Sequence, residues 1–227
     1  MTAVGIATGT GRGMGLGCAW RLTDLVAMPL PVGRDELAGT EAAKELAAAD
    51  RETKVEAFVL DITDPAGLSR LTSRVAELGS PRAVSHAAGI SPTMAEWRRV
   101  FEVDLVGTAR PAEALRPLAS EGTGTVCVAS TAPLLVNIEA DPVVAAIFDE
   151  PLRGDFLDRL REVLGPAAEN TGLAYVWAKH GVHRSRGGRR CGSGRTERGC
   201  VPSPWVSGID VLVDGGVCAA VRECAGR

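Results

Sequence analysis

The sequence predicts one α/β domain built around a doubly wound parallel sheet. Three observations favour this class: short apolar runs alternate with segments of helical spacing, a glycine-rich turn follows the first run, and polar residues stand where later runs end. A length of 227 residues suits a single domain with a substantial core. That core is expected to be aliphatic, because hydrophobic residues make up 45% of the chain and aromatic residues only 4%.

The first unit runs from a strand through a glycine turn into a helix. Val4–Ala7 is a short apolar strand, glycines follow at alternate positions, and Ala19, Trp20 and Leu22 lie in an amphipathic helical run. Glycines let a backbone approach a pyrophosphate closely, and a helix N-terminus offers unpaired N–H groups with partial positive charge. Tight turns use the same residues, so a glycine cluster alone is a weak signal.

Composition argues against several kinds of partner. A net charge of −3 does not favour nucleic acid, no apolar run reaches membrane-spanning length, and the N-terminus lacks a charged segment before an apolar stretch. We therefore expect a cytoplasmic protein whose partners are neither nucleic acids nor membranes. Six cysteines without a CxxC pair are typical of reduced thiols rather than a disulfide framework, and we expect no metal site.

The second strand, Leu25–Val32, contains two prolines, which weaken strand pairing. Arg34 and Asp35 follow it, where dinucleotide-binding folds select the adenosine ribose. An acid there accepts hydrogen bonds from the 2′-hydroxyl of NAD, whereas an arginine pairs with the 2′-phosphate of NADP. Arg34 and Arg12 favour NADP(H), Asp35 leaves NAD open, and ordinary solvated charges on a turn explain the same residues equally well.

Strands and helices continue to alternate along the middle of the chain. Asp64 is expected to cap the helix that begins at Pro65. Residues 134–171 are expected to form a helical insertion after Ser130. The expected helices are Glu36–Asp50, Pro65–Leu78, Trp97–Leu118, Pro142–Phe148 and Phe156–Leu164. The expected strands are Val55–Leu60 and Thr125–Ser130, and Arg82–Gly89 is expected to be a strand with its turn.

A tyrosine and a lysine four residues apart form the most specific motif. Tyr175 is the sole tyrosine, and Lys179 is one of three lysines. On a helix this spacing puts both side chains on one face, where the ammonium of Lys179 favours the phenolate of Tyr175. Such a tyrosine can donate a proton to a carbonyl that receives hydride, or take one from an alcohol that loses it. The alternative is an ordinary Tyr/Lys pair on a helix surface.

Together, Thr8-Gly9-x-x-x-Gly13-x-Gly15, the strand-end Ser130 and Tyr175-x-x-x-Lys179 resemble the short-chain dehydrogenase/reductase family. The resemblance implies a Rossmann-like fold and an NAD(P)(H) cofactor. It also implies catalytic roles for Ser130, Tyr175, Lys179 and Asp104, the last at a position where the family has an asparagine that supports a water relay to the lysine. The residues that it implies for cofactor binding are Thr8, Gly9, Arg12, Gly13, Met14, Gly15, Arg34, Asp61, Ile62, Ala87, Ala88, Gly89, Tyr175 and Lys179.

The resemblance also implies what some of these residues contact. Asp61, at a strand end, would bond the adenine amino group. Ala88-Gly89 keeps the half of the family's Asn-Asn-Ala-Gly turn that lets the backbone run against the cofactor, whereas His86 replaces an asparagine and is expected to be structural. The insertion, the Leu-Ala-Tyr before the helix and the later Asp-Gly-Gly resemble the bacterial 3α-hydroxysteroid dehydrogenase/carbonyl reductase subset.

The resemblance breaks after the Tyr/Lys helix, where the family's sixth strand and substrate-binding lid are not visible. Residues 183–204 are rich in arginine and glycine, and we expect a flexible linker because they bury too little apolar surface to offset their ordering entropy. Ile209–Val213 resembles the family's last strand, and we expect it to lie parallel to Thr125–Ser130 in the vacant position. The insertion is expected to block the family's usual helix-pair dimer contact.

Two functions remain open from the sequence. The first is an NAD(P)-dependent oxidoreductase that transfers a hydride between the nicotinamide and a secondary alcohol or ketone, alicyclic or steroid-like, with Tyr175 as the general acid/base. The second is a catalytically impaired dinucleotide-binding protein derived from such a dehydrogenase. Tyr175, Lys179 and Ser130 favour the enzyme, whereas Asp104, His86 and the truncated C-terminal region favour the impaired binder.

Overall fold

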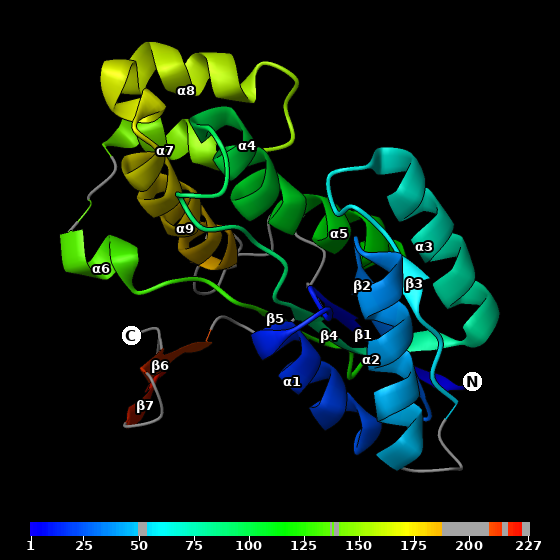
Figure 1. Cartoon of the computed structure of the whole chain (residues 1–227). Helices are drawn as coiled ribbons and strands as arrows, with labels where there is room; N and C mark the ends of the chain where they lie inside the picture. Colours follow the sequence, from blue (N-terminus) through cyan, green and yellow to red (C-terminus); the bar gives the residue numbers. More distant parts are fainter. Residues whose placement is uncertain (50–53, 137, 139–140, 188–208, 215–217, 224–227) are drawn as a thin grey trace, which may run out of the picture.

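A five-stranded parallel sheet in the order β3-β2-β1-β4-β5 forms the centre of the protein, as the sequence predicts (Figure 1). The computed structural model describes residues 1–49, 54–136, 138, 141–187, 209–214 and 218–223. The strands are β1 (Ala3–Thr8), β2 (Met28–Gly33), β3 (Phe58–Val59), β4 (Ser80–His86) and β5 (Gly124–Cys127). Strand order reverses between β1 and β4, and ligands of such sheets bind at the carboxyl ends of strands beside this point.

Helices cover both faces of the sheet, which is the Rossmann-like arrangement (Figure 1). Helices α1 and α2 contact one another on one face, and α3, α5 and α9 form the layer on the other. The helices are α1 (Gly13–Thr23), α2 (Glu36–Ala49), α3 (Pro65–Leu78), α4 (Trp97–Phe101), α5 (Gly107–Leu115), α6 (Ala132–Val136), α7 (Pro142–Phe148), α8 (Phe156–Leu164) and α9 (Thr171–Gly187). Three short segments complete the set: the π-helix η1 (Glu102–Val106) and the 3₁₀ helices η2 (Arg116–Leu118) and η3 (Gly165–Glu169).

Both prolines of β2 lie where the sheet does not need their missing N–H groups. Strand β2 is interior, between β1 and β3. Its carbonyls alternate in direction: Val32 O accepts from Thr10 N beside β1, and Gly33 O accepts from Leu60 N beside β3. Backbone groups of alternate residues point to the same side of a strand, so those of Pro29 and Pro31 point towards β3, as those of Gly33 do. Strand β3 pairs only with Val32 and Gly33, so no N–H group is needed at the prolines. Pairing with β1 is thus complete despite the prolines.

Sequence signals at helix ends predict several boundaries correctly. Asp64 is the N-cap of α3, where its side chain accepts a hydrogen bond from Ala66 N. Helices α3, α7 and α8 have the predicted bounds. The predicted helix Trp97–Leu118 is instead four consecutive segments, of which η1 contains Asp104. Such π-helical turns are frequent at functional sites.

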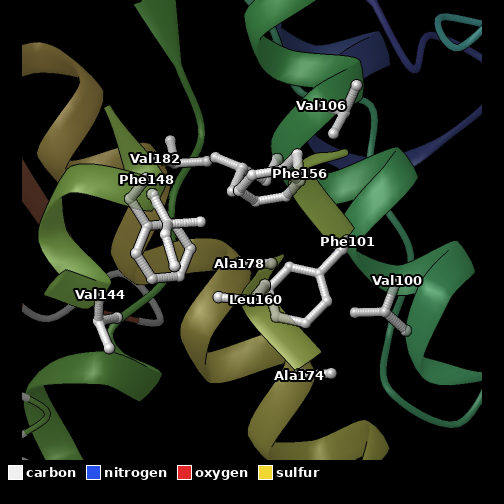
Figure 2. Packing of buried hydrophobic residues seen from close by; sticks show 12 residues of the cluster. Val100, Phe101, Val106, Val144, Phe148, Phe156, Leu160, Ala174, Ala178 and Val182 are labelled. Atoms are coloured by element: carbon white, nitrogen blue, oxygen red, sulfur yellow. The ribbon is translucent and has the colours of Figure 1, made fainter. Parts of the chain in front are cut away.

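An apolar core surrounds α9 and holds it against α4, α7 and α8 (Figure 2). Ala174, Ala178 and Val182 of α9 are fully buried there, at helical spacing along one face. Aromatic side chains are among their neighbours: Phe101 and Phe156 meet edge to face with ring centroids 6.4 Å apart. This packing fixes the position of the helix that carries Tyr175 and Lys179.

The C-terminal strands correct one sequence-based expectation. Strand β6 (Ile209–Asp214) pairs antiparallel with β7 (Cys218–Glu223), so its predicted parallel pairing with Thr125–Ser130 is wrong. Only positions 215–217 separate the two strands, and closing so short a loop costs less entropy than a long crossover. Helix α9 extends to Gly187, into the predicted linker, and 188–204 lie outside the described residues.

Membrane-spanning helices are not found among the residues that the structure describes, because none of the helices there is both long and apolar enough.

Candidate active site

The glycine turn after β1 lies directly against the turn after β4. Gly9 has a φ of +74°, and a Cβ atom there would lie 2.8 Å from Ala88 N. A Cβ atom on Gly15 would collide with the carbonyl oxygen of Gly9. Both positions therefore require glycine, because the turn, α1 and the β4 turn meet backbone to backbone. This close approach is located at the strand-order reversal, where a dinucleotide-binding fold holds its ligand.

The first turn of α1 offers free donors and nearby positive charge. Arg12 occupies the N-cap position with an extended backbone, and its side chain makes no capping bond. Met14 is exposed in the same turn, and Arg34 is exposed after β2. Among the described residues, Arg12 and Arg34 have no ion-pair partner. Asp35, the acidic alternative, accepts a hydrogen bond from Ala38 N through Oδ1. The geometry suits an anionic group at the helix N-terminus.

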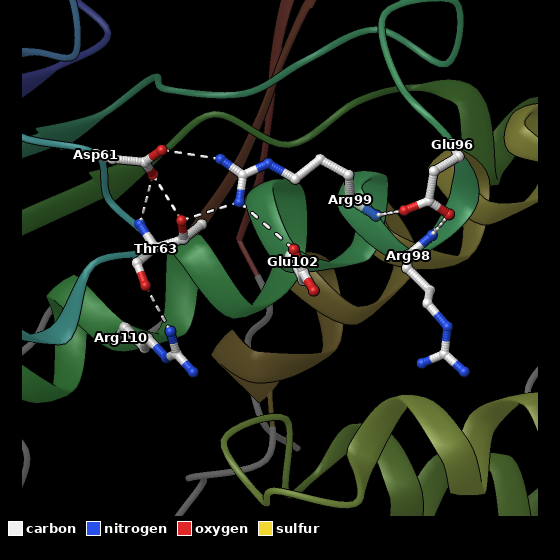
Figure 3. Close-up of polar contacts among 7 residues, drawn as sticks. All are labelled: Asp61, Thr63, Glu96, Arg98, Arg99, Glu102 and Arg110. Carbon is white, nitrogen blue, oxygen red and sulfur yellow. Dashed lines mark hydrogen bonds and ion pairs between the residues drawn. The ribbon is translucent and has the colours of Figure 1, made fainter.

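Asp61 makes an ion pair that sequence reasoning missed (Figure 3). Its Oδ2 lies 2.8 Å from Arg99 Nη2, while its Oδ1 accepts hydrogen bonds from the N–H and the hydroxyl of Thr63. Arg110 also donates to the carbonyl of Thr63, so the loop after β3 is tied to α4 and α5. Burial acts to raise the pKa of Asp61, but the bonds from Thr63 and the charge of Arg99 outweigh it and lower the pKa. The carboxylate thus stays ionised.

Thr8 joins the ends of β1 and β4 through its hydroxyl. Its Oγ1 accepts hydrogen bonds of 3.2 Å from Ala87 N and Ala88 N and lies 3.0 Å from His86 Nδ1. Because the two N–H groups use both lone pairs, the hydroxyl donates its proton to Nδ1. His86 is therefore the tautomer with its proton on Nε2, a buried atom without a hydrogen-bond partner in the described chain. The bond joins the neighbouring strands β1 and β4, which agrees with the structural role expected for His86.

The stability of the protein is expected to depend on pH through His86. Burial, with a smaller contribution from the charge of Lys179, lowers the pKa of His86 from 6.5 to about 3. Below pH 6.5 the unfolded chain binds a proton that the folded chain rejects, so the folded state loses about 1.4 kcal/mol per pH unit as pH falls from about 6.5 towards 3.

Comparison with His86→Asn measures this contribution, because an asparagine amide oxygen can still accept from Thr8. We expect the difference in unfolding free energy between the two proteins to change with pH below 6.5 and to be constant above about 7.5, by urea denaturation at a series of pH values. If the unfolding free energies of the two proteins changed with pH in the same way, His86 would not be the group responsible.

Lys179 and Asp104 form a buried ion pair. Lys179 Nζ lies 3.1 Å from Asp104 Oδ1, and the two side chains are 6% and 0% exposed. The same Oδ1 accepts from Ile90 N, which anchors the chain after β4, and Oδ2 has no partner among the described residues. Burial raises the pKa of Asp104, and the charge and hydrogen bond of Lys179 only partly oppose this. A Cβ atom on Gly89 would lie 2.6 Å from Asp104 Oδ1, so glycine is needed there too.

Tyr175 lies one helical turn before Lys179 on α9. The Lys179 Nζ is 5.6 Å from the centre of the Tyr175 ring, and the ring is half-buried against the core around α9. Ser130 follows the end of β5, and its Oγ accepts from Ala132 N at the start of α6. The Tyr175 hydroxyl makes no hydrogen bond with Ser130 in the described structure, so the predicted arrangement on a shared oxygen stays a prediction.

The structure brings together most of the residues that the sequence singled out. The glycine turn, the β4 turn, Asp104 and Lys179 are in contact. Two further residues, His183 and Arg99, contact the site and were missed: His183 Nε2 lies 2.8 Å from the Ser130 carbonyl oxygen. The signal for His183 was its position four residues after Lys179 on the same helical face. Arg99 had no comparable signal, because its partner is 38 residues away.

Comparisons with known proteins agree with this geometry. The family model described as short chain dehydrogenase matches residues 3–140. Galactitol 2-dehydrogenase of Rhizobium johnstonii is 32% identical over 111 residues, which are 45% of this chain and 42% of that protein. The chain thus spans less than half the length of this relative.

Solved structures share the fold at low identity. Salutaridine reductase of Papaver somniferum superposes with a TM-score of 0.63 at 18% identity, covering 81% of this chain and 80% of that one. RhlG of Pseudomonas aeruginosa, in an NADP active-site complex, gives a TM-score of 0.58 at 22% identity, covering 81% of this chain and 63% of that one. Since the family model covers more than half of the chain and the sheet order and glycine turn agree with it, the chain belongs to the short-chain dehydrogenase family.

Proposed function

We propose that this chain is an NAD(P)-dependent oxidoreductase that transfers a hydride between the nicotinamide and a secondary alcohol or ketone. The observation that carries the proposal is that the turn after β4 lies close to both the glycine turn and Lys179: a Cβ atom on Gly9 would meet Ala88, and a Cβ atom on Gly89 would meet Asp104 and Lys179. Lys179, with Tyr175 one turn before it on α9, therefore lies close to the sheet edge where a dinucleotide-binding fold holds its ligand.

The residues on this edge fit a nicotinamide dinucleotide. The glycine turn leaves no room for a Cβ at Gly9 or Gly15, and the uncapped start of α1 suits the pyrophosphate. The further contacts that we assign are those implied by the family resemblance, from Thr8 and Gly13 to Ile62, Ala87 and Ala88. Asp61 remains the candidate for the adenine amino group, because its side chain is 30% exposed and stays ionised. The bound cofactor supplies the hydride or accepts it.

The chain's own residues handle the proton and the position of the substrate. Tyr175 donates its phenolic proton to the ketone oxygen, or removes the proton of the alcohol in the reverse direction. The ammonium of Lys179, one turn away, stabilises the phenolate that results. The Ser130 hydroxyl accepts from Ala132 N, and its own proton is available to hydrogen-bond the same substrate oxygen.

An apolar substrate, alicyclic or steroid-like, is favoured by the surface beside Ser130. Helix α6 begins two residues after the serine, and its Leu134, Leu135 and Val136 are 59%, 83% and 53% exposed. The resemblance of 134–171 to the 3α-hydroxysteroid dehydrogenase/carbonyl reductase subset supports the same class. Galactitol 2-dehydrogenase acts, by its name, on a sugar alcohol, which favours a polar substrate instead. Turnover assays with cyclic ketones and with galactitol, using NADH and NADPH, distinguish the two, and no turnover with any would overturn the proposal.

An impaired dinucleotide-binding protein is the second candidate, and one observation favours it. Asp104 places a negative charge 3.1 Å from Lys179, which weakens the field that the ammonium exerts on Tyr175. Under this alternative, NADPH binds with enhanced nicotinamide fluorescence while no substrate of the panel is turned over. The enzyme is preferred because Tyr175, Lys179 and Ser130 are all retained.

A helix-pair dimer contact through α9 is not expected. Helix α7 covers the side of α9 opposite Lys179, where Phe148 stacks on Trp177 with ring centroids 5.8 Å apart. Any oligomer would therefore use another surface, as the insertion 134–171 suggests.

A preference for NADPH over NADH is expected from Arg12 and Arg34. Both side chains are exposed, and neither forms an ion pair within the described part of the chain, so they are available to a 2′-phosphate. Arg34→Asp should abolish or reverse the preference, since it replaces the cation with an acid that suits the 2′-hydroxyl of NADH. The preference is measured as the ratio of the dissociation constants of NADPH and NADH, both obtained from nicotinamide fluorescence.

Arg82→Asp is the matched control, because Arg82 is exposed at the opposite end of β4 and undergoes the same change of charge. The control should keep the starting ratio of NADPH to NADH affinity. Equal affinities in the starting protein that Arg34→Asp leaves unaltered would show that neither arginine contacts the phosphate.

A further inference from the structure

His183 connects the helix of the Tyr/Lys pair to the backbone of Ser130. Its Nε2 lies 2.8 Å from the Ser130 carbonyl oxygen. A carbonyl oxygen only accepts, so His183 donates and carries a proton on Nε2. This bond joins residues 53 positions apart, from the end of β5 to the last turns of α9.

Ser130 needs such a contact because the sheet does not hold it. The pairing of β5 with β4 ends at Cys127, and the next bond, from Val128 N to the carbonyl of His86, is the last link to β4 among the described residues. The side chain of Ser130 bonds Ala132 N within its own loop. Ala129 packs against the core around α9 and α6 contacts α9, and the bond to His183 adds a direct polar link from Ser130 itself to the helix of Tyr175.

Helix α9 is packed tightly enough to fix the positions of the side chains that it carries. Gly181 has no room for a Cβ, which would lie 2.9 Å from Leu105 and Phe148, and Val182 is fully buried. Tyr175, Lys179 and His183 follow one another at intervals of four residues and share one face of the helix. One packed helix thus carries the phenol, the ammonium and the donor that holds the serine.

We infer that His183 is a positioning residue, which holds Ser130 at the substrate oxygen without touching the substrate. The inference rests on the proposed function and adds to it a residue outside the Ser/Tyr/Lys set. Loss of the bond releases the β5–α6 loop, and a displacement of about 1 Å in a catalytic group can lower turnover by roughly 100-fold. Binding of NADPH does not involve this bond and stays unchanged.

Two substitutions separate the hydrogen bond from packing. His183→Gln keeps an N–H donor at a similar distance from the helix, whereas His183→Leu fills a similar volume without a donor. We expect His183→Leu to lower kcat about 10- to 100-fold, with KM for the ketone changed less than threefold, and His183→Gln to recover most of kcat. His180→Leu is the control, since His180 lies on the same helix and contacts Phe148 and Trp177 instead.

Hydrogen exchange measured by mass spectrometry provides a readout that does not need turnover. Amides of residues 126–136 should exchange faster in His183→Leu than in wild type, His183→Gln or His180→Leu. The positioning role is wrong if the exchange changes in His183→Leu but kcat does not, or if kcat is as low in His183→Gln as in His183→Leu. A wild-type protein without turnover would overturn the proposed function, and unchanged exchange in His183→Leu would separately overturn the link to Ser130.

Discussion

Replacement of Tyr175 with phenylalanine is expected to lower turnover by about 100- to 10,000-fold, the range typical of a lost general acid/base. The substitution removes the phenolic proton and leaves the ring, so packing against the core around α9 is kept. The Lys179–Asp104 pair is untouched as well. NADPH affinity should therefore change little, and the loss should appear in kcat when initial rates are measured at saturating cofactor.

Trp177→Phe supplies the matched control for this experiment. Trp177 is a half-buried aromatic on the same helix, but it stacks on Phe148 away from Lys179. A change in aromatic packing without loss of a proton donor should leave kcat within a few-fold of wild type. If Tyr175→Phe behaves like this control, Tyr175 is not the acid/base, and the proposal that rests on it fails.

Substitution of Lys179 by methionine is expected to lower both stability and activity. Asp104 has no exposed surface, so removal of its cationic partner leaves a buried carboxylate unpaired, which costs about 3–5 kcal/mol in the free energy of unfolding. The exposed pair Arg21–Asp24 is the control, because its side chains are 83% and 61% exposed. There Arg21→Met should cost less than about 1 kcal/mol in urea denaturation.

A double variant separates the two roles of Lys179. In Lys179→Met/Asp104→Asn the side chain at position 104 carries no charge, and its amide oxygen can still accept from Ile90 N. We expect most of the lost stability to return while turnover stays low, because the cation beside Tyr175 is still absent. Wild-type turnover in the double variant would exclude Lys179 from catalysis, and unchanged stability in the single variant would contradict the cost assigned to an unpaired carboxylate at Asp104.

The local signals of the sequence were the most accurate. The strand–glycine turn–helix unit forms at Ala3–Thr23, and the Pro65–Leu78 helix begins after its Asp64 cap. These features depend on backbone preferences and on periodicity over a few residues, so they can be read without knowledge of the rest of the chain. The spacing of Tyr175 and Lys179 belongs to the same class, since a helix puts i and i+4 on one face.

Strand pairing was predicted less well, because it depends on which edges are available. The prolines of β2 suggested a weak strand, yet they lie on the side where β3 pairs with only two of its residues. Of the predicted strand Val55–Leu60, only Phe58–Val59 forms a strand in the structure. Ile209–Val213 was correctly predicted as strand, but its partner was not.

By itself, the sequence determined the α/β class, the order of elements, the glycine turn and the Tyr175/Lys179 pair. The tertiary structure alone decided that Asp104 would pair with Lys179 and that His183 would hold Ser130, because these partners are distant along the chain. Their contacts arise from where packed helices place them at one edge of the sheet. Residue types and local spacing do not predict which residues far apart in the chain come into contact. Once such residues are buried, a charge or a hydrogen-bond donor needs its partner, because water no longer solvates it.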